Sequence, residues 1–448
     1  MAIEHNEVSP VTQKLAAHIA GALRNPLPDA VAEKTKHHLL DTIAAMVSGT
    51  KLLPGRKAID YVKTLGGAKE ASVVGTRVLT TAELAALANG IAAHADETDD
   101  SHAPSLTHPG CGIVPAALAM AERERRGGQD LLGAVALGYD VGTRLTLSLD
   151  PYEFREDGHS THSFGPMFGA AAAAGALASL EPRQVRHLLS FTAQQASGIS
   201  SWARDAEHVE KAFDFGGMPA RNGVAAAAMV AAGFTGVEDV FSGERNFFVA
   251  YGREPDPNEL VRELGTTYEI MNTNIKRWAV GSPIQAPLDS LLDLIRTHGV
   301  KPEEIEHVVV RVSHEGAQTT DNRDMPDICM QHMCAVMLLD GTVTFESAHD
   351  YERMQDSEVR ALRSRIELRG DDEMSRALPS RQGSVELRLR DGRTAENPMT
   401  RAEVEEKCFP LLAPTLGAKR AKALCDAVWN LEAMTDAREL RPLLRGSG

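Results

Sequence analysis

Apolar residues recur at the spacing of an α-helix over most of the chain. Leu84, Leu87, Ala88 and Ile91 stand at positions i, i+3, i+4 and i+7, directly after Thr80–Glu83, which has the spacing of a capping box. The same periodicity, with its start and stop signals, predicts further helices over residues 9–23, 29–49, 57–65, 113–126, 130–149, 165–180 and 182–199, from Asn222, and again from about Arg401.

The pattern changes after about residue 270. Apolar and polar residues alternate over 306–312, 365–369 and 384–390, the last closed by the turn pair Asp391-Gly392, while helical spacing returns near 286–297, 331–339 and 357–364. We therefore predict a mainly α fold: a large all-helical domain, discontinuous in sequence (1–270 and 401–448), with a smaller inserted α+β domain at 271–400.

Composition narrows the possible partners. The chain has 448 residues, 43% of them hydrophobic, which is enough for a large core and two domains. Alanine runs such as 170–174 predict closely packed helices. A net charge of −15 argues against nucleic acid or an anionic membrane as a partner. An anionic substrate must therefore be attracted by local cations.

The cysteines and the opening residues indicate the compartment. The five cysteines form no Cys-x-x-Cys pair, which fits free thiols and weakens the case for an iron–sulfur cluster or structural zinc. Residues 1–8 are polar, and no uncharged run of about eighteen apolar residues occurs. We expect a soluble cytoplasmic protein.

Chemistry-bearing residues concentrate between His94 and His108. Four acids and three histidines lie within these fifteen residues, and Pro104, Pro109 and Gly110 should break any helix there and leave His108 on a Pro-Gly turn. A loop held between two buried helices can position ionisable groups. The alternative is a loop whose charges are only solvated.

Four further positions could join this loop. His159 lies in a glycine-containing loop before an apolar helix, Lys211 precedes a Gly-Gly turn, Lys276 lies at the domain junction, and His332 occupies an apolar helix. The alternatives are a capping histidine, two solvated lysines and a satisfied core histidine. A metal could use the loop's histidines and acids, but no helical His-x-x-x-His spacing supports it, so we predict none.

Taken together, these residues resemble the MmgE/PrpD family, which contains 2-methylcitrate dehydratase, cis-aconitate decarboxylase and an iminodisuccinate epimerase. The likeness covers nearly the whole chain. It is carried, in order, by 39–43 with 48–49, 89–94, 99–101 with 107–109, 158–161 with 164–166, 194–198, Lys211, 275–277 and 337–341.

The resemblance implies a cofactor-free fold, a helical domain under an α+β lid, a homodimer, and a pocket for di- or tricarboxylates. At matching positions the pocket is formed by Glu97, Ser101, His108, His159, Lys211, Lys276 and His332. Five departures leave the substrate open. Glu97 stands where the family commonly has Asp, His332 where it has Tyr and Asp214 where it has His, and the turn after Asp214 is one residue longer. The segment 278–285 also lacks the Cys and His of some dehydratases.

The chemistry that follows is that of a lyase, a dehydratase or decarboxylase. Lys211 and Lys276 would clamp substrate carboxylates, and His108 and His159 would exchange protons near pH 7. Glu97, Asp99 and Asp100 would orient the histidines. Ser101 and Thr161 would form hydrogen bonds to the substrate. His332 would supply an imidazole as the acid where the family commonly has the phenol of a tyrosine. The alternatives are an epimerase or isomerase using the same site, a non-catalytic carboxylate-binding paralogue, and a metal-dependent hydrolase.

Overall fold

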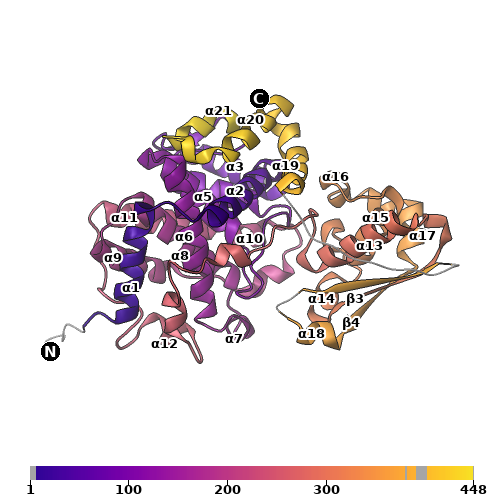
Figure 1. Ribbon diagram of the computed structural model, residues 1–448, viewed down its shortest axis with the longest axis horizontal. Helices are drawn as coiled ribbons and strands as arrows, with labels where there is room; N and C mark the ends of the chain where they lie inside the picture. The colour runs from indigo at the N-terminus through magenta and orange to yellow at the C-terminus, as the bar shows by residue number, and fades with distance from the viewer. Residues whose placement is uncertain (1–6, 379–380, 390–400, 447–448) are drawn as a thin grey trace. The chain divides into compact units, whose positions relative to one another are not determined.

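The computed structural model of the chain describes residues 7–378, 381–389 and 401–446, and these divide into two compact units (Figure 1). Unit 1 comprises Met1–Ala95, Asp99–Ile275 and Cys408–Gly448, and unit 2 comprises Asp96–Thr98 and Lys276–Lys407. Unit 1 is helical apart from one two-stranded ribbon, and unit 2 combines a sheet with helices. The predicted mainly α fold, with a helical part discontinuous in sequence, is confirmed.

Most helices of unit 1 coincide with the apolar periodicity. The helices of unit 1 are α1 (Pro10–Gly21), α2 (Asp29–Gly49), α3 (Leu53–Leu65), α4 (Ala82–Ala93), α5 (Pro109–Glu124), α6 (Gly128–Leu147), α7 (Pro151–Glu156), α8 (Thr161–Leu177), α9 (Pro182–Gln195), α10 (Val209–Ala212), the π-helical turn η3 (Phe213–Gly217), α11 (Met218–Ala231), α12 (Phe247–Tyr251), α20 (Ala418–Trp429) and α21 (Arg441–Leu444). The sequence had not predicted α7, α10, η3 or α12. The ribbon pairs β1 (Ala71–Ser72) with β2 (Leu79–Thr80). Helix α19 (Arg401–Leu416) crosses the division between the units.

The centre of unit 1 is the contact between α6 and α8. A Cβ on Gly142 would lie 2.7 Å from the Gly165 carbonyl oxygen, and one on Gly169 would overlap the Gly138 carbonyl oxygen. The two backbones therefore touch, which only glycine permits. The alanine run of α8 is wholly buried beside this contact, so the small residues produce the close packing that the sequence predicts.

No helix passes through residues 94–108, as predicted, but the next helix, α5, begins at Pro109 and not near residue 113, so Pro109 and Gly110 lie in its first turn. Proline suits the first position of a helix, where its missing N–H has no intrahelical partner to lose. The Gly110 N–H donates to Asp100 Oδ1 at 2.9 Å, which satisfies another free donor of the first turn. His108 is thus the residue that caps α5, not a member of a Pro-Gly turn.

The C-terminal segment returns to unit 1. Helix α20, yellow in Figure 1, packs against α2. The Lys36 ammonium of α2 bonds the Glu432 carboxylate at 2.6 Å and the Trp429 carbonyl oxygen at 3.2 Å. The last helices thereby close the unit that the first helices begin.

Unit 2 is built on a three-stranded sheet in the order β4-β3-β5. Strand β3 (Ile305–Ser313) pairs in parallel with β4 (Ile366–Asp371) and antiparallel with β5 (Gly383–Leu389). Three valines of β3, at 308, 310 and 312, point into the core, as alternation predicts. The predicted turn at 391–392 lies outside the described residues.

The helices of unit 2 pack around this sheet. Helix α13 (Gln285–His298) contacts β5, and α15 (Met330–Asp340) contacts β4 and α17 (Ser357–Arg363). The helices of this unit are α13 (Gln285–His298), α14 (His314–Thr320), α15 (Met330–Asp340), α16 (Phe345–Ala348), α17 (Ser357–Arg363) and α18 (Asp372–Arg376). Apolar side chains of α13, α15, α16 and α17 and of the strands form one buried cluster.

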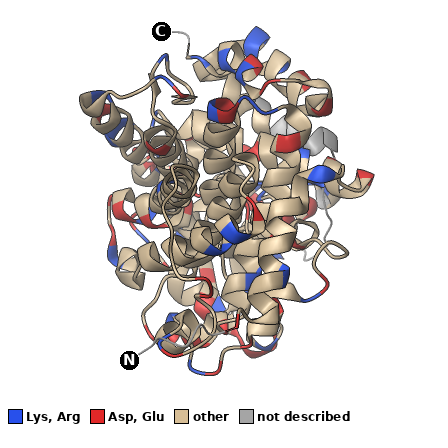
Figure 2. Ribbon diagram, turned by 90° about the vertical axis from the view of Figure 1, so that its left-hand side faces the viewer, with Lys and Arg blue, Asp and Glu red and all other residues tan. Residues whose placement is uncertain are grey.

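Charge and apolar length add two further facts. Both signs of charge are interspersed along the helices and loops on the side of the molecule that faces the viewer in Figure 2. Over the part of the chain that the structure describes, none of the helices is both long and apolar enough to cross a membrane.

We expect Gly90→Ala to destabilise unit 1. Its Cβ would overlap the Gly216 carbonyl oxygen, so α4 and η3 would have to separate. Such overpacking typically costs about 1–3 kcal/mol of unfolding free energy, more than the gain in helix propensity. Thermal unfolding measures the loss. Gly21→Ala is the control, because nothing lies within 4 Å of a Cβ there; equal midpoints for the two variants would contradict the packing argument.

Candidate active site

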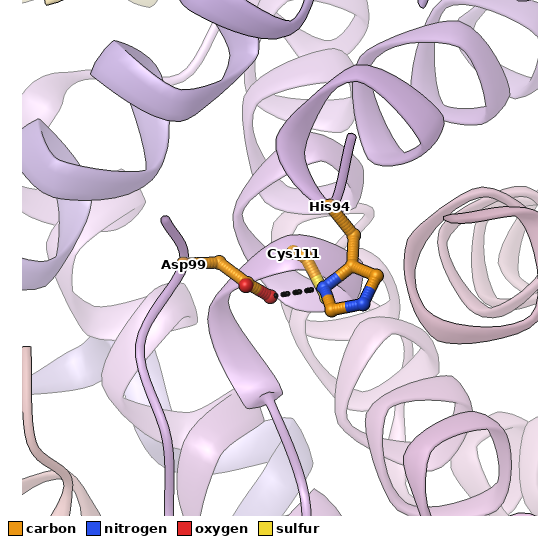
Figure 3. A group of neighbouring side chains, drawn as sticks. All are labelled: His94, Asp99 and Cys111. Atoms are coloured by element: carbon orange, nitrogen blue, oxygen red, sulfur yellow. Dashed lines mark hydrogen bonds and ion pairs between the residues drawn. The ribbon is translucent and has the colours of Figure 1, made fainter. Parts of the chain in front are cut away.

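The centre of the candidate site is a carboxylate between two imidazoles. Asp99 Oδ2 lies 2.8 Å from His94 Nδ1 (Figure 3), and Asp99 Oδ1 lies 3.5 Å from His108 Nδ1. His94 and Asp99 are wholly buried, and His108 is 7% exposed. Asp99 therefore fixes the orientation of two rings, as an acid does in a catalytic triad.

Local structure places these three residues. His94 ends α4, whose start is capped by the Thr81 hydroxyl accepting the Leu84 N–H. His108 caps α5, and Asp99 lies in the chain between the two helices. Both histidines are thus anchored by helix ends, which hold side chains more rigidly than a long loop does.

Phe215 is the hub of a ring cluster. Its ring stacks on His94 at 4.2 Å and on His162 at 3.8 Å between centroids, and the ring of His108 lies 5.7 Å away. Phe215 belongs to the π-helical turn η3. A π-turn holds one residue more than an α-turn.

His208 supports the same cluster from α10. Its Nε2 donates to the His94 carbonyl oxygen at 3.1 Å, and its ring stacks on that of His94 at 5.3 Å. His208 has a φ of 61°, a left-handed backbone conformation that residues other than glycine adopt rarely. The end of α4 is therefore fixed by the start of α10.

Lys211 brings a cation to this cluster. Its ammonium lies 5.3 Å from the centroid of Phe215 and 5.5 Å from that of Trp202. Aromatic faces attract a cation and restrict where it lies. Its backbone N–H donates to Asp205 at 3.0 Å, which fixes the start of the short helix. Lys211 is thus held near two histidine rings in a protein whose net charge is negative.

Asp100 serves a different buried network. It accepts hydrogen bonds from Tyr139 Oη at 2.5 Å and His38 Nδ1 at 2.6 Å, besides the Gly110 N–H. Burial raises the pKa of this carboxyl, but His38, the Tyr139 hydroxyl and the Gly110 N–H together outweigh burial and leave the pKa below its ordinary value. Asp100 thus anchors α2, α5 and α6 around the site.

Three other predicted residues have structural contacts of their own. The Thr161 hydroxyl donates to the Leu106 carbonyl oxygen at 2.6 Å, and the backbone of Ser101 pairs with that of Asn274. His159 stacks on Phe154 at 4.6 Å, with Phe164 and Tyr251 as its other ring neighbours. The ring contacts thus connect His162, not His159, to His108, whose centroid lies 5.2 Å from that of His162.

Two predicted residues form a pair within unit 2. The Lys276 ammonium donates to the Glu97 carbonyl oxygen at 2.6 Å and lies 3.5 Å from its carboxylate. Both side chains are buried, and Glu97 has a φ of 57°. Glu97 thus holds Lys276 by backbone and side chain together.

His332 lies in α15 of unit 2 and is wholly buried. Burial, followed by the charges of Arg363 and Arg353, lowers its pKa to about 4. Neither ring nitrogen has a hydrogen-bond partner among the residues that the structure describes. The ring is therefore neutral at pH 7, and both of its nitrogens can form a hydrogen bond to another group.

A metal could in principle use this region. Single ligand atoms of His94, Asp99 and Cys111 lie within 4.8 Å of one another (Figure 3). However, the Cys111 thiol donates to the carbonyl oxygens of His108 at 3.1 Å and Phe215 at 3.5 Å, and Asp99 is hydrogen-bonded to His94. A metal would need a thiolate and would break these bonds. The donor set fits a hydrogen-bonded group better than a metal centre.

Asp214 is a buried acid beside the ring cluster. It accepts a hydrogen bond from the Ser160 hydroxyl, which in turn accepts from Trp202 Nε1 at 3.3 Å. Burial raises the pKa of Asp214 from 3.8 to about 7. The group therefore changes charge near neutrality.

We expect Asp214→Asn to flatten the pH dependence of stability. Between about pH 4 and pH 7 the unfolded chain has released this proton while the folded chain retains it, so wild-type stability falls as pH rises. A difference of about three pKa units corresponds to about 4 kcal/mol at most. Unfolding midpoints should agree near pH 4, and the variant should be more stable near pH 8. Parallel pH curves would contradict this.

The sequence had not singled out His162 or Phe215 as members of the site. His162 stands three residues after His159, but His159 precedes α8 and His162 lies in its first turn, so the two rings meet different neighbours. Phe215 looked like an ordinary core residue before a Gly-Gly turn. The available signal was the number of histidines: four of the sixteen in the chain, at 94, 108, 162 and 208, belong to this ring cluster.

The structure defines a class of protein: a discontinuous helical unit with a buried carboxylate–histidine group, interrupted by a small α+β unit. Comparison with known families identifies it further. The model of the MmgE/PrpD N-terminal domain matches residues 13–260, and that of the C-terminal domain matches 278–432. The chain belongs to the MmgE/PrpD family.

Curated relatives match along almost the entire chain. A cis-aconitate decarboxylase-like protein of Aspergillus oryzae is 24% identical over 97% of this chain and 97% of its own length. The cis-aconitate decarboxylases of Homo sapiens and Aspergillus terreus are 25% and 23% identical, over 97% and 98% of this chain and 95% and 97% of their own lengths.

Proposed function

We propose that this protein is a cofactor-independent lyase that removes water or carbon dioxide from a small di- or tricarboxylate. The observation that carries the proposal is the Asp99 carboxylate between His94 and His108, with the Lys211 ammonium beside the same ring cluster. The family assignment and the decarboxylase relatives support a lyase acting on small carboxylates.

Each residue type has a role in such a reaction. Lys211 binds a substrate carboxylate through a charge-assisted hydrogen bond, and Lys276 of unit 2 keeps its predicted role as a carboxylate-binding residue. In a dehydration, His108 takes the carbon-bound proton, and the hydroxyl leaves as water after a second group protonates it. In a decarboxylation, the C–C bond breaks, carbon dioxide leaves, and His108 returns a proton to the carbon that keeps the electron pair.

The other predicted residues support these steps. Asp99 positions His108 and stabilises its charged form, and Asp100 positions α5, which carries His108. Glu97 positions Lys276. We propose that His159, Ser101 and Thr161 support the helix and loop ends around His108. We propose a small-molecule carboxylate as the ligand and a homodimer as the assembly.

The test is a substrate panel of cis-aconitate, citrate and 2-methylcitrate, with products followed by proton NMR in heavy water. A lyase gives an unsaturated product or carbon dioxide. Deuterium entering recovered substrate, with no unsaturated product, would replace the lyase by an epimerase. Elemental analysis and dialysis against a chelator test cofactor independence, and activity that falls with the metal content would contradict it.

We expect His332→Tyr to change the acidic limb of the pH–rate profile. His332 becomes charged only below about pH 4, whereas a tyrosine phenol stays neutral throughout the acidic range. The ratio kcat/KM measured from about pH 4 to pH 8 should therefore lose the part of its acidic limb that belongs to His332. Superimposable curves would argue against a role for this residue.

A further inference from the structure

A cavity of about 410 Å³ lies in unit 1 between the end of α1 and α6. Its wall comes from the last turn of α1 and the chain that follows, from one face of α6, and from Gly265 and Tyr268. None of the described residues that line it belongs to the ring cluster or has a role in the proposed reaction. Pockets of this size are typical of small-molecule sites. We therefore examined which ligand its wall would bind.

Asp140 is the acid of this wall. It is 1% exposed, and its Oδ1 accepts the Glu269 N–H at 2.6 Å. Asp140 forms no ion pair with any residue that the structure describes. The neighbouring cation, Arg144, instead bonds the Thr267 hydroxyl at 3.0 Å and lies 3.5 Å from the Glu269 carboxylate. Because an ionised carboxylate is costly to bury without a partner, Asp140 favours a positively charged ligand.

Two further features of the wall favour the same sign of charge. The last turn of α1 borders the cavity at His18 and Gly21, and the backbone carbonyls of a helix end carry partial negative charge. Tyr268 adds a phenol, whose oxygen accepts hydrogen bonds and whose ring attracts cations. Burial and the charge of Asp140 raise the pKa of Tyr268, so this phenol is neutral.

The basic side chains near the cavity do not neutralise Asp140. Burial, followed by the charges of Arg144 and Lys14, lowers the pKa of His18, so its imidazole is neutral near pH 7. The Lys14 ammonium donates to the Val261 carbonyl oxygen at 3.0 Å. Burial raises the pKa of Asp140 to about 7 in spite of Arg144. At neutral pH the carboxyl therefore holds a proton about half of the time.

Apolar side chains form much of the remaining wall. Ala17 and Ala22 contribute from the end of α1 and the residues after it, Leu27 from the following chain, and Leu137 from α6. Apolar surface of this kind binds the carbon skeleton of a ligand, while a few polar groups fix its orientation. The wall thus suits a molecule with a charged group at one end and an apolar body.

We propose that this cavity binds a small organic amine, whose ammonium group pairs with Asp140 and whose apolar body lies against the alanines and leucines of the wall. The site is separate from the proposed lyase site, and its test does not depend on that function. The charge of a bound ammonium favours the ionised form of Asp140, so a protonated carboxyl releases its proton on binding. Amine binding should therefore strengthen from about pH 5.5 to pH 8.

Calorimetric titration of the full-length protein with phenethylamine tests this, with butylamine as a smaller amine. Phenethyl alcohol and hydrocinnamate are the neutral and anionic analogues. Phenethylamine should bind about tenfold more tightly than phenethyl alcohol, because a charged group makes the stronger hydrogen bond. Near pH 6.5, titration in buffers of different ionisation enthalpy should show release of about half to one proton per bound amine.

Two variants locate the binding. Asp140→Asn should weaken phenethylamine binding about tenfold and abolish the proton release. Asp130→Asn is the matched control, because Asp130 lies on the same helix, pairs with Arg126 and does not line the cavity. Ala17→Trp should abolish the binding of amine and alcohol alike, because its side chain would occupy the cavity from an exposed position.

The inference is overturned by any of three results. The first is equal or tighter binding of the alcohol or of hydrocinnamate. The second is unchanged amine affinity and proton release in folded Asp140→Asn, or unchanged affinity in Ala17→Trp. The third is the absence of saturable binding by either amine at millimolar concentration. Each of these results leaves the carboxylate lyase standing, because substrate turnover is not the readout.

Discussion

Replacing Asp99 by asparagine should lower kcat by about 10²- to 10⁴-fold while leaving the fold intact. Asp99 accepts from His94 and faces His108, both through Nδ1. An asparagine has the same shape, but only one of its two terminal atoms is an acceptor. Its amide group would face one of the two imidazoles and impose the opposite tautomer on it.

The measurement is steady-state kinetics with whichever acid of the panel is turned over. Asp140→Asn is the control: this acid is buried in the same unit and accepts the Glu269 N–H at 2.6 Å, but belongs to no contact of the ring cluster. Because burial raises the pKa of Asp140 to about 7, an asparagine there resembles a form already present at neutral pH. A kcat for Asp99→Asn within about twofold of that control would show that the carboxylate has no catalytic role.

Replacing Lys211 by methionine should lower kcat/KM by about 10- to 150-fold. The unbranched side chain becomes one atom shorter and loses its charge, so one charge-assisted hydrogen bond to a carboxylate, typically worth about 1.5–3 kcal/mol, disappears. Lys211→Arg should recover part of the loss, since arginine also binds carboxylates and also lies well on aromatic faces. The ammonium lies over Phe215 and Trp202, which makes the replacement by an apolar chain structurally mild.

The control for charge alone is Lys63→Met, at an exposed position on α3 whose partner is Asp60. It changes the net charge of the protein by the same amount. If Lys63→Met and Lys211→Met reduce kcat/KM equally, the effect is one of overall charge and not of a carboxylate clamp. A loss that decreases steeply with added salt in both variants would lead to the same conclusion.

The sequence predicted the helices and strands better than the contacts between them. Periodicity located most helices and all three strands of the unit 2 sheet, because burial of one face imposes a repeat that is legible in a single chain. Pro109 misled because proline both breaks helices and begins them, and only the fit of the next turn decides. The ribbon at 71–72 and 79–80 is too short to give a pattern.

Candidate residues were predictable as types and not as partners. The histidines, lysines and acids of the site could be chosen from the sequence, but nothing in the spacing of Asp99 and Asp100 indicates that one faces His94 and the other His38. Adjacent residues outside regular structure can point in opposite directions, so their networks diverge. The same holds for His159, which precedes α8 and stacks on Phe154, and His162, which lies in α8 and stacks on Phe215.

The π-helical turn Phe213–Gly217 has a consequence for how this stretch can vary. Lys211 precedes it, Phe215 lies within it, and α11 continues directly after it. Shortening the turn by a single residue would convert it to ordinary α-helix and swing every side chain before it by roughly 100° about the axis. Changes of side chain here are therefore expected to be tolerated far more readily than changes of length, because a deletion would redirect the ammonium away from the imidazoles in one step.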